Sequence, residues 1–156
     1  MPETEARGVI VTGRDEAQAR ALFQERYRNP PSRLTRQIEQ QVIGGDWGAN
    51  GYTTMAQADT LARGLGLSAT DRLLDIGTGR GWPGLYLAAR TGCRVILTDL
   101  PLEGLRVAAN RATAEGLAAG AAMVVAPPAG CPFGPAASTP SSTPTCCVDC
   151  GPSSPC

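Results

Sequence analysis

Histidine and lysine are both absent from this chain of 156 residues, so all fourteen basic side chains are arginines. Without histidine, the chain lacks the commonest general base and the commonest metal ligand of enzymes. Acidic side chains also number fourteen, and the resulting formal net charge of zero argues against electrostatic capture of nucleic acid or of an anionic membrane. We therefore expect no nucleic-acid partner, no membrane partner and no metal site.

Long apolar runs are also missing. No stretch approaches the about 18 apolar residues of a membrane span. The first ten residues carry charges where a signal peptide would have its apolar core. A chain of this length can bury the core of one domain. These observations predict a soluble protein of the cytoplasm.

Charge becomes scarce in the last part of the chain. Asp149 is the only charged side chain after Glu115, and eight of the thirteen prolines lie beyond residue 126. Such a composition has too few apolar side chains to offset the entropy lost on ordering, so we expect a disordered tail. We also expect no fourth strand beside residues 73–76. The chain accordingly divides into an N-terminal helical region, a central α/β unit and a tail, at residues 1–53, 54–126 and 127–156.

Apolar spacing predicts the elements of the first two parts. Helices are expected where apolar residues recur at helical intervals between capping and breaking residues, at 15–28, 33–43, from Thr53 or Thr54 to about 63, 82–90 and 102–115. Short apolar runs predict strands at 72–76, 94–99 and 121–126. Strands that alternate with helices of about ten residues indicate right-handed crossovers and a parallel sheet. The expected fold is therefore α/β, a partial Rossmann-like, doubly wound sheet of three strands.

A turn of glycines follows the first strand. Residues 77–81, Gly-Thr-Gly-Arg-Gly, which we call the glycine loop, lead from that strand into a helix. Glycine allows a ligand to approach the main chain, and a helix N-terminus carries a partial positive charge. The second strand ends at Asp99, whose carboxylate can accept hydrogen bonds from the two hydroxyls of a ribose. This pairing predicts a site for an adenosine-type nucleotide.

Two residues indicate which nucleotide is bound. A dinucleotide fingerprint needs glycine at position 82, where this chain has Trp82. Asp75, two residues before Gly77, would repel a pyrophosphate but suits a cation such as the ammonium and sulfonium groups of S-adenosylmethionine. The stretch LLDIGTGRG resembles the D-x-G-x-G-x-G signature of class I methyltransferases, and VILTDL resembles their acidic second motif.

This resemblance implies an S-adenosylmethionine-dependent methyltransferase that acts on a small molecule. By the resemblance, Asp75 and the glycine loop with Gly77, Thr78, Gly79 and Gly81 line the methionine part of S-adenosylmethionine. Asp99 holds the ribose, and Leu100 lies against the adenine. Tyr52 and Thr53 become candidate contacts of a lid, whereas Trp47 and Tyr52 are at least as well explained as anchors of their loop to the core. The matched motifs identify no catalytic residue, methyl acceptor or oligomeric state.

Two other functions stay open at this stage. One is a fragment of an NAD-dependent oxidoreductase, which Trp82 and Asp75 disfavour. The other is a binding remnant without catalytic activity. Competition between S-adenosylhomocysteine and NAD separates the first from a methyltransferase, and a methylation assay separates the second.

The tail invites two further hypotheses. Cys147 and Cys150 have the spacing of half a zinc site or of a redox pair, but no second ligand pair accompanies them. If the possible codons are shifted by one base, residues 130–147 become compatible with LPFRPGSFDAVVHADVL, which resembles the turn and fourth strand of the methyltransferase family. We therefore hypothesise that a frameshift truncated a methyltransferase and produced this tail.

Overall fold

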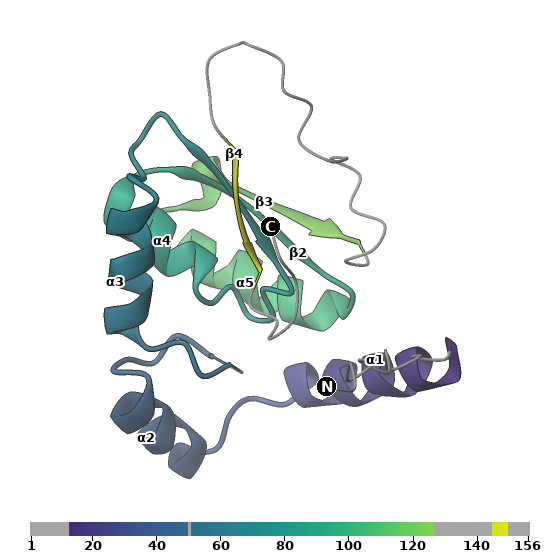
Figure 1. Ribbon diagram of the computed structural model, residues 1–156. Helices are drawn as coiled ribbons and strands as arrows, with labels where there is room; N and C mark the ends of the chain where they lie inside the picture. The colour runs from purple at the N-terminus through teal and green to yellow at the C-terminus, as the bar shows by residue number, and fades with distance from the viewer. Residues whose placement is uncertain (1–12, 50, 127–144, 150–156) are drawn as a thin grey trace, which may run out of the picture.

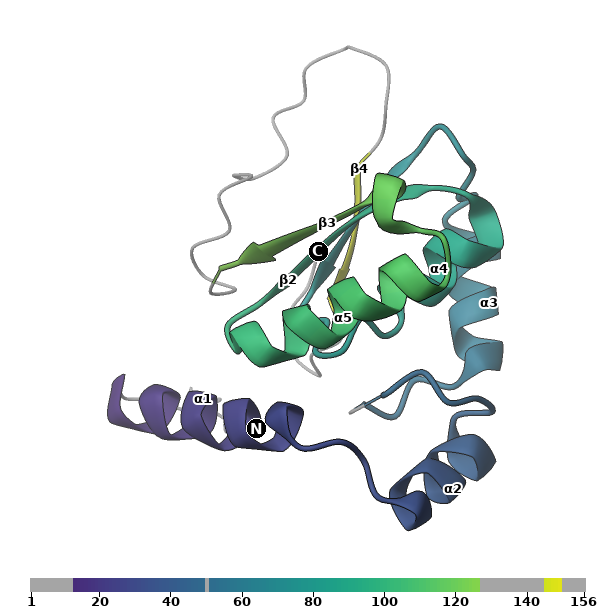
Figure 2. The same ribbon diagram turned by 180° about the vertical axis from the view of Figure 1, so that it is seen from behind.

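The computed structural model describes residues 13–49, 51–126 and 145–149 as one parallel sheet with helices around it (Figures 1 and 2). The helices are α1 (Gly13–Arg28), α2 (Arg33–Val42), α3 (Met55–Gly64), α4 (Gly84–Thr91) and α5 (Leu102–Ala114), with a 3-10 turn at Ala118–Gly120. The strands are β1 (Arg72–Ile76), β2 (Arg94–Asp99), β3 (Ala121–Val125) and β4 (Thr145–Asp149). The α/β fold and the parallel sheet are thus confirmed, and the first three strands lie where the sequence predicts them.

The strand order is β3-β2-β1-β4, with every neighbouring pair parallel. Two right-handed crossovers that step in the same direction place α4 and α5 on one face of the sheet, which is clear from the two opposite views (Figures 1 and 2). All four strands end at one edge. The chain steps from β1 to β2 on one side, and β4 lies on the other, so β1 marks the point where the strand order reverses.

A core cluster of buried side chains holds the sheet and α4 together. Leu73, Val95 and Leu97 on β1 and β2 are at most 1% exposed, as are Leu85 and Leu87 on α4. Continuous apolar runs of this kind are typical of parallel strands that are buried in an α/β fold. The core therefore rigidly supports the loops at the carboxyl edge of the sheet.

Helices α2 and α3 begin at side-chain caps. Ser32 accepts a hydrogen bond from the backbone of Thr35 at the start of α2. Thr54, rather than Thr53, caps α3 and forms a capping box with Gln57. Helix α1 lies beyond the carboxyl edge of the sheet and packs against α5 (Figure 1). None of the described helices is long and apolar enough to cross a membrane.

The tail contributes a strand, contrary to the expectation from its composition. Arg72 to Ile76 of β1 pair with Thr145 to Asp149 of β4 along their whole length, so the prediction that no strand lies beside β1 is wrong. Residues 145–151 are the longest stretch of the tail without proline, and the β-branched Thr145 and Val148 favour a strand. The average composition of the whole tail does not reveal this short stretch without proline. Without β4, the edge of β1 would be unpaired.

Two other expectations for the tail, its disorder and its origin in a frameshift, remain predictions. The predicted disorder concerns residues 127–144 and 150–156, which lie outside the described residues, as does Cys150. The frameshift hypothesis concerns the coding sequence, which the structure does not test, so it stays a prediction.

The pairing of β4 can be tested by truncation. A chain that ends at Ala126 should unfold with a free energy roughly 1–3 kcal/mol lower than a chain that ends at Asp149, because β1 loses the hydrogen bonds of one edge. Urea denaturation of the two chains measures the difference. Equal stabilities would contradict the pairing.

Candidate functional site

The glycine loop folds back onto the end of β2. The backbone N–H groups of Gly77 and Thr78 both donate to the carbonyl oxygen of Thr98, at 2.8 and 3.1 Å. The N–H of Gly79 donates to Oδ2 of Asp99 at 2.6 Å. Gly81 donates to the carbonyl of Thr78 at 3.0 Å. These amides are therefore satisfied within the protein and are not directed at a ligand.

Asp75 lies below the glycine loop and is completely buried. Its Oδ2 accepts a hydrogen bond from the Thr78 hydroxyl at 2.7 Å and another from the Gly84 N–H, at the start of α4, at 2.9 Å. A methyl group on Gly84 would lie 2.5 Å from this same oxygen, so only glycine permits the contact. The carboxylate of Asp75 thus occupies the helix N-terminus, where a bound phosphate would otherwise lie.

Burial controls the ionisation of Asp75. Desolvation raises the pKa of Asp75 to about 7, the hydrogen bonds from Thr78 and Gly84 lower it, and the nearby charge of Asp99 raises it. Its second oxygen, Oδ1, has no hydrogen-bond partner among the described residues. The carboxyl group of Asp75 therefore changes its charge near neutral pH.

Asp99 joins the glycine loop to the cavity above it. Its Oδ1 accepts from the N–H of Leu100 at 2.7 Å, while Oδ2 holds Gly79. Each carboxylate oxygen keeps a lone pair for a further donor. Burial raises the pKa of Asp99 above its usual value, and the two backbone hydrogen bonds partly oppose that shift. Asp99 is only partly buried and lines the cavity, so its carboxylate can accept hydrogen bonds from a ligand.

The glycines of the loop serve different purposes. Gly77, Gly79 and Gly81 all have positive φ, at 73°, 58° and 96°. A Cβ on Gly77 would have no atom within 4 Å, and Gly77 lines the cavity. A Cβ on Gly81 would lie 2.5 Å from the side chain of Leu85. Gly77 thus leaves space for a ligand, whereas Gly81 lets the loop pack onto α4.

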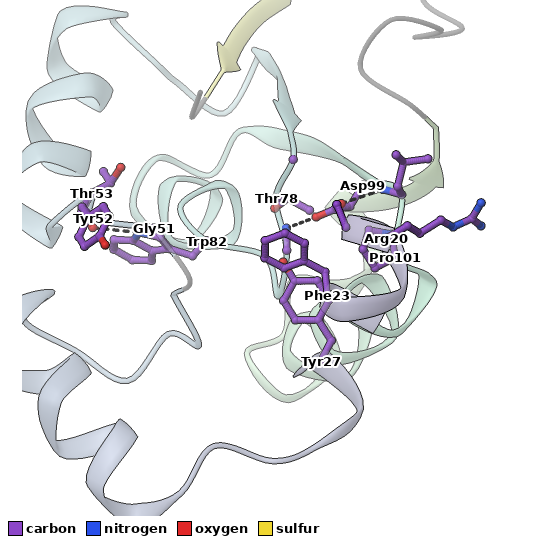
Figure 3. A pocket seen from close by; sticks show the side chains of 14 residues that line it. Arg20, Phe23, Tyr27, Gly51, Tyr52, Thr53, Thr78, Trp82, Asp99 and Pro101 are labelled. Carbon is purple, nitrogen blue, oxygen red and sulfur yellow. Dashed lines mark hydrogen bonds between the residues drawn. The ribbon is translucent and has the colours of Figure 1, made fainter. Parts of the chain in front are cut away.

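A cavity of about 380 Å³ lies over the glycine loop. Figure 3 shows Phe23 and Tyr27 of α1 on one side of it and Tyr52 and Trp82 on the other. Its lining combines the carboxyl edge of the sheet with the N-terminal region, namely Ala19, Arg20, Phe23, Tyr27, Gly51, Tyr52, Thr53, Gly77, Thr78, Gly79, Trp82, Asp99, Leu100 and Pro101. The cavity therefore exists only where α1 covers the loops of the sheet.

Trp82 anchors the segment before α3. Its ring packs 6.0 Å from Trp47 and 5.4 Å from Tyr86, measured between ring centroids, and its Nε1 donates to the carbonyl of Thr53 at 3.0 Å. Trp47 is part of this aromatic cluster, which agrees with its interpretation as an anchor. Tyr52 is 92% exposed at the mouth of the cavity.

The structure brings most of the predicted site residues together. Gly77, Thr78, Gly79, Asp99 and Leu100 line the cavity. Asp75 and Gly81 do not, since both lie beneath the loop and hold its shape.

Sequence reasoning missed the contribution of α1. Phe23 and Tyr27 lie one helical turn apart, and this spacing was a signal that both face the same partner. Arg80 was missed too, although a charged side chain inside a tight loop of glycines is itself unusual.

Comparison with solved structures identifies the fold. No family model matches the sequence, and no curated protein matches it. A geranyl diphosphate methyltransferase, solved with GPP and sinefungin, superposes with a TM-score of 0.50 over 70% of this chain and 49% of its own, at 23% identity. This chain has a methyltransferase fold.

Two further structures resemble this methyltransferase fold less closely. A SAM-dependent methyltransferase from Thiobacillus denitrificans has a TM-score of 0.47 and 24% identity, over 63% of this chain and 38% of its own. An RNA methyltransferase from Salinibacter ruber has a TM-score of 0.46 and 22% identity, over 47% of this chain and 48% of its own. Both were solved with S-adenosyl-L-homocysteine. The chain thus spans half or less of the length of each of these structures, and the assignment of the fold rests on the first.

The raised pKa of Asp75 predicts a dependence of stability on pH. Because the folded protein holds the Asp75 proton up to about pH 7 and the unfolded chain releases it near pH 4, stability should fall by on the order of a few kcal/mol as pH rises from 4 to 7. Asp75→Asn keeps an acceptor oxygen and removes the titration, so its stability should fall less over this range. Urea denaturation between pH 4 and 8 measures both proteins, and parallel curves would contradict the assignment.

The two roles of glycine give a matched pair of variants. Both Gly77→Ala and Gly81→Ala place a side chain at positive φ, which costs roughly 1–2 kcal/mol. Only Gly81→Ala also collides with Leu85, so we expect it to lower the melting temperature more. Differential scanning calorimetry makes the comparison, and an equal or smaller loss for Gly81→Ala would show that the loop can move away from α4.

Proposed function

We propose that this chain is the cofactor-binding part of an S-adenosylmethionine-dependent methyltransferase that acts on a small molecule. The observation that carries the proposal is the position of Asp99, whose carboxylate is fixed by two backbone N–H groups and faces the cavity beside the glycine loop. A carboxylate at the end of the second strand of such a sheet binds the hydroxyls of a ribose. S-adenosylmethionine combines that ribose with a cationic amino-acid part.

The residues at the cavity fit such a cofactor. Asp99 places a carboxylate at the cavity beside the loop, which suits a sulfonium and an ammonium group and opposes a phosphate. Gly77 leaves open space where a Cβ would point. Leu100, Phe23 and the ring of Tyr27 supply the apolar surface that an adenine needs. In this proposal Asp99 holds the ribose, Leu100 lies against the adenine, and Gly77, Thr78 and Gly79 border the methionine part.

Asp75 and Gly81 have a supporting role in this proposal. Asp75 orders Thr78 and the start of α4, and Gly81 seats the loop on α4. They are positioning residues, since both act on the cofactor through the backbone of the loop.

When bound, S-adenosylmethionine supplies an electrophilic methyl group. The residues of this chain bind the cofactor and orient it at the edge of β1, where the strand order reverses. Transfer then depends on a methyl acceptor held in line with the sulfonium, which is a matter of positioning. The acceptor is proposed to be a small molecule, and no catalytic base is assigned.

The same geometry disfavours an NAD-dependent oxidoreductase. A dinucleotide fold holds its pyrophosphate on the free N–H groups of a glycine turn and on a helix N-terminus. Here the amides of Gly77, Thr78 and Gly79 are bonded within the protein, and Asp75 caps α4. A pyrophosphate at this loop would meet a carboxylate instead of free donors.

Calorimetry with two ligands tests the proposal directly. S-adenosylhomocysteine should bind to the intact chain in a one-to-one ratio, and NAD should show no binding at the same concentrations. Binding of NAD, or of neither ligand, would contradict the proposed function.

Replacement of Asp99 tests the role of its carboxylate. Asp99→Ala removes two charge-assisted hydrogen bonds to the ribose, so the affinity for S-adenosylhomocysteine should fall by about 2–3 kcal/mol, or roughly 30- to 150-fold. Glu115→Ala, at an exposed acid near the end of α5, is the control and should bind as the wild type does. A loss below threefold for Asp99→Ala would leave Asp99 as a structural residue of the loop.

A further inference from the structure

Arg80 lies inside the glycine loop, and its side chain points away from the cavity lining. The side chain is 7% exposed, so its positive charge needs buried partners. Its Nη2 donates to the backbone carbonyls of Arg26 and Asn29, at 2.9 and 3.0 Å. The Arg26 carbonyl lies in the last turn of α1 and the Asn29 carbonyl directly follows the helix, where helices leave acceptors unsatisfied and where a positive charge is favourable.

Two other parts of the N-terminal region contact the same side chain. The guanidinium carbon of Arg80 lies 5.6 Å from the centre of the Tyr27 ring. A Cβ on Gly48 would lie 3.2 Å from Cδ of Arg80, so the backbone at Gly48 rests against the aliphatic part of the arginine. Arg80 thus joins the glycine loop to α1 on one side and to the loop before α3 on the other.

Glu39 holds that second contact in place. Its Oε1 accepts hydrogen bonds from the N–H groups of Trp47 and Ala49, each at 2.8 Å, which fixes the backbone on both sides of Gly48. Glu39 is 7% exposed and comes from α2. The backbone that presses on Arg80 is therefore itself rigid.

These contacts decide the position of one wall of the cavity. Helix α1 supplies Phe23 and Tyr27 to the lining, yet Leu22 is 68% exposed and Phe23 is 38% exposed. A helix with so little buried apolar surface depends on its few polar contacts for its position. Besides Arg80, it packs against α5, where Tyr27 lies so close to Gly104 that a Cβ there would be 3.0 Å from the ring.

We propose that Arg80 is a positioning residue that clamps α1 onto the glycine loop, so that docking of α1 and filling of the cavity depend on each other. The inference rests on the proposed function in one respect, namely that the ligand is of the S-adenosylmethionine type. A ligand that contacts both the loop and α1 stabilises the docked helix, and by linkage a docked helix raises the affinity for the ligand.

Hydrogen exchange of the free protein tests the clamp without any ligand. Arg80→Met keeps an apolar side chain of similar length and removes the donors. We expect the backbone amides of α1 to exchange roughly tenfold faster or more than in the wild type, while the amides of β1 and β2 exchange at unchanged rates. Arg63→Met, at an exposed arginine of α3, is the matched control and should leave α1 unchanged.

Ligand affinity provides a second test of the role of Arg80. The affinity of Arg80→Met for S-adenosylhomocysteine should fall about 10- to 100-fold, because α1 loses two hydrogen bonds from a charged donor and no longer covers the bound ligand. Saturation with S-adenosylhomocysteine should slow exchange in both the glycine loop and α1 of the wild type, but only in the loop of Arg80→Met. If Arg80 served only to stabilise the fold, its replacement would not produce different effects of the ligand on exchange in the glycine loop and in α1. Arg80→Lys, with one ammonium in place of the planar fork, should have an intermediate affinity.

The outcomes distinguish the clamp from the proposed function. If wild-type protein binds no S-adenosylhomocysteine, the proposed function fails, and the exchange of α1 in free Arg80→Met still decides the clamp. If Arg80→Met does not fold, Gly48→Ala replaces it, since its methyl group presses on the arginine from the opposite side and should also release α1. Exchange of α1 and affinity both within threefold of wild type in a folded variant would overturn the proposal.

Discussion

The buried carboxylate of Asp75 is the interaction on which the glycine loop depends. One of its oxygens bonds both the Thr78 hydroxyl and the Gly84 N–H, and so joins the end of β1, the loop and the start of α4. Removing a carboxylate from water opposes its charged form, and the pKa near neutrality is the consequence. The loop therefore obtains its shape from an internal carboxyl group, which occupies the helix N-terminus that could otherwise attract a phosphate.

A second carboxylate extends this arrangement to the ligand side. Asp99 bonds the backbone of Gly79 and Leu100 and still presents its oxygens to the cavity. The amides of Gly77, Thr78 and Gly79 are thereby used within the protein, and the polar groups that Asp99 leaves for a ligand are acceptors. That chemistry favours a ribose joined to a cation over a dinucleotide, in keeping with the methyltransferase fold.

The opposite wall of the cavity comes from α1, far away in sequence. Its Phe23 and Tyr27 cover the loop, and Arg80 bonds the carbonyls at the end of that helix. The sheet side of the site is held by a buried core, whereas the helix side is held by a few polar contacts. Because the sheet side is rigid and α1 is held less tightly, a ligand can enter the cavity and then be enclosed by α1.

The sequence by itself determined the order of the elements, the parallel sheet and the positions of the glycine loop and Asp99. These depend on local patterns, namely apolar runs, turn residues and caps, which act over a few residues. Only the tertiary structure decided which loop residues face the cavity, that α1 closes it, and that residues 145–149 pair with β1. The closure by α1 depends on contacts between residues more than fifty positions apart, such as Arg80 with Arg26. The fourth strand depends on the open edge of β1, which pairs even with the short run 145–149. Patterns of neighbouring residues do not predict such contacts, because the contacts form between segments that only folding brings together.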